Sequence, residues 1–324
     1  MKKLTEEKIT PIYSGKPNDF CWAGFGSGSG TNLRECAKVA PPKLIFSDRP
    51  GAKLLSLEEL ANVQQIVVDG YKACGSWKKA QGNPEAEAEY KERSVLYNQR
   101  IVGLLKQFEE KQGKPIDLIV LGGYMRLVGE PLLEAYPDKI INVHPADLSI
   151  LNYFIGHSSV KHNMGLYQII HHLGEKAGLQ TTLVDDIDRE LEKKPITVMR
   201  KFTGEDAVYD AVKAGQTATR SSVIIVDAGE DHGEMLTIGP SVNVWPEYVN
   251  GTPAEREECL REYADAHQSF QKVRSDWPAL TTALRLIAEG RLALGTEKTW
   301  FNEWRAVYVD GKKMPYQGFE AGGE

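Results

Sequence analysis

The stretch "FCWAGFGSGSGTNL", residues 20–33, joins an apolar run to a glycine-rich turn and the start of a helical pattern. The run favours a buried β-strand, and the amphipathic continuation from Thr31 favours a helix. Short apolar runs of this kind alternate with longer amphipathic stretches along the chain. This alternation is typical of an α/β protein with a largely parallel sheet.

Seven apolar runs predict strands, at residues 20–25, 43–47, 65–69, 117–124, 140–144, 221–229 and 234–244. Helices are expected at residues 31–40, 86–113 and 205–215, and across 252–290 with Pro278 dividing the last one. Alternating residues around Asp310-Gly311 predict a β-hairpin near the C-terminus.

The composition of the 324-residue chain is that of a soluble globular protein, with 41% hydrophobic and 26% charged residues. With a net charge of −6, the chain lacks the excess of positive charge that is typical of proteins that bind nucleic acid or acidic membranes. No apolar run reaches about 18 residues, and the N-terminus lacks the apolar stretch of a signal peptide. Four scattered cysteines without a CxxC pair indicate reduced thiols. We therefore expect a cytoplasmic protein that binds a small molecule.

No repeat or low-complexity linker is visible, which favours one domain at 20–324 after an N-terminal extension at 1–19. Insertions are expected near 71–95 and 151–200, where strand patterns are weak. The charge run "DDIDRELEKK" in the second insertion is interpreted as a solvated helix face. Four histidines in that insertion match no zinc-binding spacing, so no metal site is expected (His157, His162, His171 and His172).

The glycine-rich turn carries a glycine at every second position. Glycines let a backbone approach a ligand closely, and the free N–H groups at a helix start favour an anion such as phosphate. Gly26, Gly28 and Gly30 give GxGxG, not the dinucleotide-binding GxGxxG, and no GKS or GKT marks a nucleoside triphosphate loop. A phosphate-binding turn and a plain strand-to-helix turn both fit these residues.

A second candidate ligand-binding segment follows the strand predicted at residues 117–124. In open α/β sheets ligands bind beyond the carboxyl ends of the strands, so residues that leave this strand are placed to touch one. Arg126 could contact such a ligand, or it could be a surface charge at the start of the next helix.

The stretch "KIINVHPADLSI", residues 139–150, interrupts an apolar strand with an amide and an imidazole. Asn142 and His144 are two residues apart, so they project from the same face. A neutral histidine can accept a proton from an attacking nucleophile, and an amide can donate to the oxyanion that forms. A lone strand histidine is also compatible with a purely structural role.

The loop "VDAGEDHGEML", residues 226–236, carries acidic side chains between two predicted strands. A carboxylate here could orient His144 and stabilise its protonated form. The same acids also suit an ordinary solvated turn. Covalent catalysis has no candidate, because no GxSxG motif occurs and no cysteine has a nucleophile context.

In this order and spacing, the four segments resemble the formyltransferase family, and within it the folate-dependent glycinamide ribonucleotide formyltransferases. The family's G-x-G-S-N-L turn is matched by "GSGTNL" at 28–33, and its "LAGFMRIL"-like strand end by "LGGYMRLV" at 121–128. Its N-x-H-P is matched at 142–145, and its aspartate followed by a glycine is matched by Asp231 and Gly233. The resemblance spans about residues 20 to 320.

The resemblance implies a single open, mostly parallel, twisted sheet with helices on both faces. It also implies that the formyl group of 10-formyltetrahydrofolate, a co-substrate, is transferred to the amine of a phosphorylated acceptor, with no metal. Asn142 would hold the oxyanion, His144 would relay the proton, and Asp231 would fix the imidazole. The acceptor would be bound by Gly30, Thr31, Asn32 and Pro145. The folate pocket would be lined by Tyr124, Met125, Arg126, Leu127, Val128, Asp227, Ala228 and Glu230.

The departures from the family pattern cluster on the acceptor side. After the N-x-H-P motif the family usually continues S-L-L-P, whereas residues 146–149 read "ADLS". Ile224 replaces a histidine common in that strand, and Val273 aligns with a glutamate associated with the acceptor's ribose, although Asp276 could take that role. These changes leave the acceptor open, with glycinamide ribonucleotide, a purine-biosynthesis intermediate, as the default.

Three alternatives stay open at this point. The first is a formyltetrahydrofolate hydrolase, which would use similar residues with water in place of the amine. The second is a related formyltransferase with another amino-sugar or amine as its acceptor. The third is a binding protein that keeps the fold but has lost the catalytic activity. The insertion at 151–200 could be a lid over the acceptor, a contact in a homodimer, or a replacement for lost ribose contacts. We expect the lid, because the insertion directly follows the predicted catalytic strand.

Overall fold

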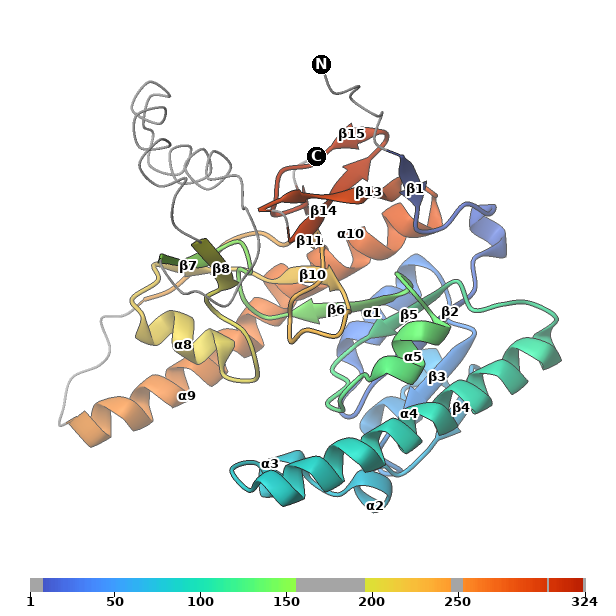
Figure 1. Cartoon of the computed structure of the whole chain (residues 1–324), viewed down its shortest axis with the longest axis horizontal. Coiled ribbons are helices and arrows are strands. Elements are labelled where there is room, and N and C mark those ends of the chain that lie inside the picture. The colour runs from blue at the N-terminus through green and yellow to red at the C-terminus, as the bar shows by residue number, and fades with distance from the viewer. Residues whose placement is uncertain (1–7, 156–195, 246–252, 302, 323–324) are drawn as a thin grey trace.

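The computed structural model describes residues 8–155, 196–245, 253–301 and 303–322. The predicted α/β fold is confirmed, with an eight-stranded main sheet in the order β16-β11-β10-β6-β5-β2-β3-β4 (Figure 1). Its strands are β2 (Trp22–Phe25), β3 (Leu44–Ser47), β4 (Gln64–Val67), β5 (Leu118–Leu121), β6 (Ile140–His144), β10 (Ser222–Ile225), β11 (Met235–Ile238) and β16 (Phe319–Glu320).

The main sheet is mixed but mostly parallel, as expected. Strands β4, β3, β2, β5 and β6 pair in parallel, and β16 pairs in parallel with β11. Strand β10 runs antiparallel to both β6 and β11. The carboxyl ends of β2, β3, β4, β5 and β6 therefore meet at one edge of the sheet, the place where such sheets bind ligands.

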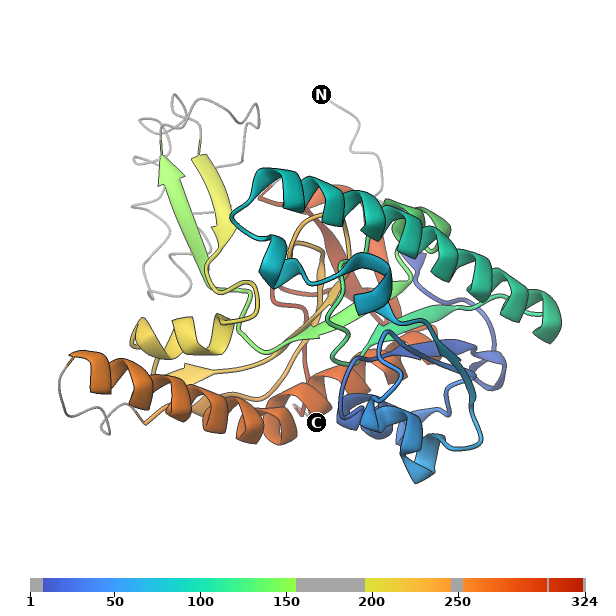
Figure 2. The same cartoon turned by 90° about the horizontal axis from the view of Figure 1, so that it is seen from below.

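Helices cover both faces of this sheet, because successive side chains of each strand point to opposite sides. Trp22, Val120 and Ile141 join a core with α1 (Thr31–Val39) and α10 (Trp277–Ala288). Phe25 and Ile119 join a second core on the other face, with α2 (Gly70–Cys74), α3 (Trp77–Ala80), α4 (Pro84–Gln112) and α5 (Glu130–Ala135). Figure 2 shows α4 and α10 on opposite sides of the sheet.

A second, antiparallel sheet accompanies the single sheet that was expected. It has the order β1-β13-β14-β15, with β1 (Ile9–Pro11), β13 (Leu292–Trp300), β14 (Trp304–Val309) and β15 (Lys312–Lys313). The predicted hairpin is present, and Asp310 and Gly311 take the positive φ values of 51° and 74° that a tight two-residue turn requires. Strand β1 lies in the predicted N-terminal extension and pairs with β13.

The helical region before β13 is interrupted next to the predicted proline. It consists of α9 (Pro253–Gln271), a π-helical turn at Lys272–Asp276, and α10, where Pro278 lies in the first turn. Proline lacks an N–H group and clashes with the preceding helical turn, so the extra residue of a π turn accommodates it. The turn packs on the sheet, because the N–H of Ser221 donates to Ser275 Oγ at 2.8 Å.

The insertion predicted at 151–200 begins and ends in a pair of antiparallel strands, β7 (Leu151–Ile155) and β8 (Ile196–Arg200). Leu151 and Arg200 are direct neighbours, so the insertion leaves and returns at one point. Residues 156–195, with the charge run and the four histidines, lie outside the described residues, and the lid stays a prediction. The segment 71–95 is helical, from α2 into α4.

The remaining short elements connect these parts. They are η1 (Pro17–Asp19), η2 (Lys53–Ser56), η3 (Glu58–Leu60), α8 (Ala207–Lys213), β9 (Ala218–Thr219) and β12 (Val242–Asn243). None of the helices that the structure describes is long and apolar enough to cross a membrane.

Two glycines of the glycine-rich turn make a matched test of its backbone. Gly30 has φ +70°, and a Cβ there would lie 2.4 Å from Leu54 Cβ, whereas a Cβ on Gly28 would meet nothing within 4 Å. Gly30→Ala is therefore expected to lower the free energy of unfolding by about 2–4 kcal/mol. Gly28→Ala should have little effect. Urea denaturation of both variants measures the difference, and equal effects would contradict this account of the turn.

Candidate active site

The loops that follow β2, β5 and β6 meet at the carboxyl edge of the main sheet. The N–H of Ser27 donates to the carbonyl of Gly123 at 3.1 Å, and the N–H of Met125 donates to Ser27 Oγ at 2.9 Å. Strand β6, which ends at His144, lies beside β5 in the sheet. The glycine-rich turn, the segment that follows β5 (residues 122–128, called the β5 exit below) and the end of β6 therefore lie side by side at this edge.

His144 contacts Asp231 across this edge. Its Nδ1 lies 3.2 Å from Asp231 Oδ2, and its Nε2 lies 2.9 Å from the carbonyl oxygen of Phe202. The imidazole is only 3% exposed. Asp231 thus faces the histidine directly, although it lies 87 positions further along the sequence.

The two neighbours of His144 are both hydrogen-bond acceptors. A carbonyl oxygen only accepts, so Nε2 must carry a hydrogen to bond to Phe202. An ionised carboxylate also only accepts, so a hydrogen on Nδ1 is needed to bond to Asp231. A neutral imidazole carries one hydrogen and can donate to only one of these partners, so a hydrogen on Nδ1 leaves Nε2 able to accept a proton, and the carboxylate stabilises the imidazolium that then forms.

The Asp231 carboxylate is kept ionised by its surroundings. Burial alone raises the pKa of Asp231, but the hydrogen bond and charge of His144, the N–H of Gly204 and the charge of Arg200 outweigh burial and lower the pKa below its ordinary value. The N–H of Gly204 donates to Asp231 Oδ2 at 2.9 Å. The backbone of Asp231 has φ +48°, an uncommon conformation for a residue other than glycine.

Arg200 holds the loop that carries Asp231. Its guanidinium donates to the carbonyl oxygens of Asp231 and Gly233, the latter at 2.8 Å, and its Nε donates to Tyr316 Oη at 3.1 Å. It also lies 5.0 Å from the ring centroid of Trp304. A buried cation that bonds to two carbonyls of one loop fixes the path of that loop. Arg200 therefore braces the uncommon backbone of Asp231.

Asn142 completes the polar face of β6. It is half-buried, lies two residues before His144 on the strand, and pairs with Leu121 of β5 and Ile224 of β10. Within the part of the chain that the structure describes, its side-chain amide has no hydrogen-bond partner. The amide is therefore free to donate to a ligand at the edge of the sheet.

The comparisons with known proteins agree with this geometry. Residues 44–166 match a family model described as "Formyl transferase". This part of the chain is therefore similar to the formyl transferase family. A relative in Bacillus subtilis, named phosphoribosylglycinamide formyltransferase, is 31% identical over 146 residues, which cover 43% of this chain and 61% of the relative. This alignment thus spans less than two thirds of the relative's length.

A solved structure supports the same fold. It is a phosphoribosylglycinamide formyltransferase from Coxiella burnetii in complex with CHES, matched with a TM-score of 0.50 at 17% identity over 93% of this chain and 99% of that one. At this identity the likeness shows the fold alone. The main sheet and the helices on its two faces therefore have the fold of that solved structure.

The four residues expected to bind the acceptor differ in what they leave available to a ligand. Gly30 precedes the first residue of α1, Thr31, and leaves the helix without a side-chain cap. The side chain of Asn32 is taken, since its Oδ1 accepts from Trp277 Nε1 at 3.1 Å, so only its N–H can serve a ligand. The Pro145 carbonyl accepts from Gln271 Nε2 at 2.8 Å, next to the histidine.

Two of the residues expected to line the folate pocket have their side chains bound to interior residues, and the other six are exposed or half-buried. Tyr124 is buried against Phe25 and Phe46 and serves the core. Arg126 is not a surface charge, because its Nε donates to the fully buried Asp48 at 3.0 Å. The remaining expected residues are exposed or half-buried, namely Met125, Leu127, Val128, Asp227, Ala228 and Glu230.

Three contributors were missed by the sequence analysis: the side chain of Arg200, the carbonyl of Phe202 and the N–H of Gly204. In the sequence, Arg200 marks only the end of the insertion expected near 151–200, and residues 201–204 carry no site prediction. Two of the three contacts are made by the backbone, which leaves no trace in residue types. The lone arginine ending the apolar run "ITVM" was the one available signal.

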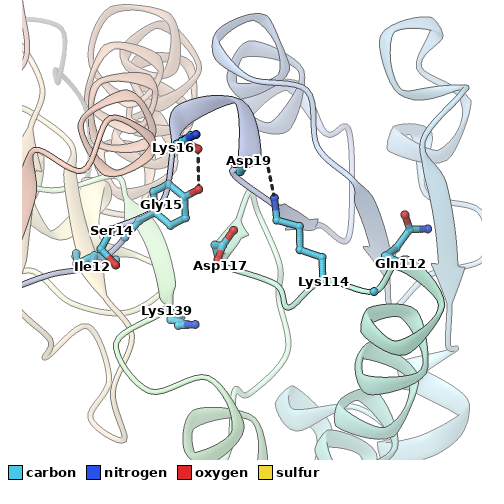
Figure 3. Close-up of a pocket in the computed structure, with 11 residues that line it drawn as sticks. Ile12, Ser14, Gly15, Lys16, Asp19, Gln112, Lys114, Asp117 and Lys139 are labelled. Atoms are coloured by element: carbon cyan, nitrogen blue, oxygen red, sulfur yellow. Dashed lines mark hydrogen bonds and ion pairs between the residues drawn. The ribbon is translucent and has the colours of Figure 1, made fainter.

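Two other features lie apart from this site. A cavity of about 680 Å³ opens at the amino ends of β2, β5 and β6, where Figure 3 shows Lys114 and Lys139 with Asp117. It is on the opposite edge of the sheet from His144. Among the described residues, no group of three or more histidine, cysteine or acidic side chains could hold a metal ion.

Proposed function

We propose that this protein transfers the formyl group of 10-formyltetrahydrofolate to the amine of a phosphorylated acceptor, with glycinamide ribonucleotide as the first candidate. The observation that carries the proposal is the contact of 3.2 Å between His144 and Asp231, two residues along β6 from the amide of Asn142, which no described residue pairs. A base, the carboxylate that orients it and an oxyanion donor are the groups that acyl transfer needs.

The proposed steps use these three side chains. The acceptor amine attacks the formyl carbon, and the carbonyl oxygen becomes an oxyanion that the amide of Asn142 stabilises. His144 takes the proton from the attacking nitrogen and returns it to the departing folate nitrogen. Asp231, kept ionised by its lowered pKa, stabilises the imidazolium that exists between these two transfers.

The hydrogen bond between His144 and Phe202 sets a condition on this mechanism. With Nδ1 directed at Asp231, Nε2 is the nitrogen left for proton transfer, and it bonds to the Phe202 carbonyl. The acceptor amine must therefore take the place of that carbonyl before it reacts. Phe202 lies just after β8, so the exit of the insertion is the segment that must shift.

The folate would lie along the β5 exit. Met125 and Leu127 are 55% and 52% exposed, which is high for large apolar side chains next to a polar site. Their backbone is fixed, because the carbonyl of Leu127 accepts from Asn98 Nδ2 at 3.1 Å. An exposed apolar rim on a rigid backbone suits a flat aromatic ring such as the pterin.

The acceptor side is less complete. Val273, which aligns with the ribose-associated glutamate, is 47% exposed. Asp276 is buried, bonds to Ser221 Oγ, and has its pKa raised by burial, so its carboxylate serves the interior. Neither residue offers the acceptor a charged contact. Glycinamide ribonucleotide, also called phosphoribosylglycinamide, is proposed because the Bacillus subtilis relative is named phosphoribosylglycinamide formyltransferase.

An acceptor screen tests the proposal. The protein is mixed with 10-formyltetrahydrofolate and each phosphorylated amine, glycinamide ribonucleotide first, while folate absorbance and the mass of the acceptor are followed. We expect acceptor-dependent turnover and a gain of one formyl group in the product. Formate release without any acceptor would assign a hydrolase instead, and bound folate that is never turned over would assign a binding module.

A further inference from the structure

Gln271 is a fully buried side chain at the end of α9 that contacts the segment after β6. Its Nε2 donates to the Pro145 carbonyl at 2.8 Å and to Ser221 Oγ at 3.0 Å. Its Oε1 accepts the hydroxyl of Thr219. Because a carbonyl oxygen only accepts, the nitrogen of this amide must face Pro145. Both hydrogens and the oxygen of the amide are therefore in use, which fixes its orientation.

The π-helical turn after Gln271 explains why three side chains of one helical region converge on Ser221. The N–H of Ser221 donates to Ser275 Oγ at 2.8 Å, and its hydroxyl donates to Asp276. In an α-helix of 3.6 residues per turn, residues five apart do not share a face, whereas a π turn joins each residue to the fifth one along. The turn at Lys272–Asp276 therefore brings Asp276 onto the face of Gln271 and Ser275.

A buried histidine holds the amide of Gln271 in turn. Thr219 uses its single hydrogen to bond to Gln271, so His267 Nε2, which lies 2.7 Å from Thr219 Oγ1, must be the donor of that contact. Burial lowers the pKa of His267 and favours the neutral ring. The donations thus run from His267 to Thr219 and on to Gln271, and the amide cannot turn without breaking this chain.

The Pro145 carbonyl is the group through which this network reaches the end of β6. Proline has no N–H, so the residue after His144 cannot donate a backbone hydrogen bond. The next carbonyl, that of Ala146, accepts from Ser222 Oγ at 2.9 Å, and Ser222 pairs with His144 in the sheet. The backbone after His144 is therefore held at Pro145 by Gln271 and at Ala146 by Ser222.

We propose that Gln271 is a positioning residue, which holds His144 against Asp231 by fixing the carbonyl of Pro145. The inference rests on the proposed function, because the position of His144 matters only if its imidazole transfers protons. The amide acts through the backbone of residue 145, since the two imidazole nitrogens contact Asp231 and Phe202 instead. A rotation of the peptide that joins His144 to Pro145 would move Nδ1 out of its 3.2 Å contact with Asp231.

The first test replaces Gln271 with methionine, which has a similar length and no amide. We expect Gln271→Met to lower kcat for formyl transfer by about 10- to 100-fold, the effect that a small displacement of a catalytic group has. The affinity for 10-formyltetrahydrofolate should stay nearly unchanged, because Ser27 and Asn98 hold the β5 exit. Steady-state kinetics and an equilibrium folate titration measure the two quantities.

Thr237→Val is the matched control. The fully buried Thr237 hydroxyl donates to the Ala279 carbonyl of α10 at 2.9 Å, so valine removes a hydrogen bond between the sheet and the next helix, away from β6. This variant should be less stable to urea and keep its kcat. An equal loss of kcat in both variants, or a destabilised Gln271→Met with the kcat of the wild type, would overturn the inference.

A milder variant serves if Gln271→Met does not fold. Thr219→Val removes the hydroxyl that orients the amide but leaves Gln271 in place. We expect kcat to fall in Thr219→Val, by a smaller factor than in Gln271→Met, with folate affinity again nearly unchanged. A Thr219→Val variant that folds and turns over like the wild type would count against the network.

Proton NMR of the protein without substrates separates this inference from the proposed function. A hydrogen between His144 Nδ1 and Asp231 is deshielded by the carboxylate, so its signal lies at low field and disappears in His144→Ala. We expect this signal to move or vanish in Gln271→Met and to persist in Thr237→Val, and an unchanged signal in Gln271→Met would overturn the inference. A changed signal without any formyl transfer would retain the positioning role and remove the proposed function. Formyl transfer that Gln271→Met leaves intact would do the reverse.

Discussion

Replacing His144 with alanine is expected to lower kcat for formyl transfer by about 10³- to 10⁴-fold, with affinity for folate nearly unchanged. In the proposed mechanism the imidazole carries the proton from the amine to the folate nitrogen. The β5 exit is anchored independently, since the N–H of Met125 donates to Ser27 Oγ at 2.9 Å. Steady-state kinetics and an equilibrium folate titration measure the two quantities.

A matched control is available in the same loop as Asp231. His232 is a half-buried histidine whose Nδ1 lies 2.7 Å from Asp227 Oδ2 and whose ring centroid lies 5.2 Å from that of Trp304. His232→Ala makes the same chemical change and should retain most of the activity. Weaker folate binding with turnover preserved in His144→Ala would contradict the role given to His144.

Replacing Arg200 with methionine is expected to lower kcat/KM by about 100-fold, because a small misplacement of a catalytic group has an effect of this size. The change leaves the carbonyls of Asp231 and Gly233 without their donor, which should lower the free energy of unfolding by about 3 kcal/mol. Kinetics and urea denaturation measure these effects.

A pH profile separates positioning from simple destabilisation. Three groups lower the pKa of Asp231 against the effect of burial, namely His144 from β6, Gly204 after β8, and Arg200 at the end of β8. Without the charge of Arg200 the pKa of Asp231 should rise, so activity should be lost at a higher pH on acidification. A profile that stays in place while stability falls would make Arg200 structural only. Arg200→Lys, which keeps the charge, should restore the profile in part.

The fold could be predicted because its signals are local. The alternation of strand and helix patterns placed the core of the main sheet, and Asp310-Gly311 placed the hairpin through the positive φ values that its turn requires. The second sheet was not predicted as such, because β1 is a three-residue strand with all three residues exposed. An exposed strand of this length has no apolar pattern to read.

Some contacts of the candidate site could also be predicted from the sequence, and others could not. The face shared by Asn142 and His144 follows from the two-residue period of a strand. A carboxylate of the 226–236 loop was considered as a partner of His144 from the residues, but the choice of Asp231 rested on resemblance alone. The contacts from Phe202 and Gly204 are made by backbone atoms after an insertion, and no residue type records them. Arg126 was left between ligand contact and surface charge, and the structure shows an ion pair with Asp48, distant in sequence.

The central claim is that His144 and Asp231 act as one unit on a formyl group, and a double-mutant cycle tests it most directly. The kcat of His144→Ala, of Asp231→Asn and of the variant with both changes is compared with that of the wild type. Because the carboxylate acts only through the imidazole, adding Asp231→Asn to His144→Ala should lower kcat little further. Two independent losses that multiply in the double variant would contradict the account.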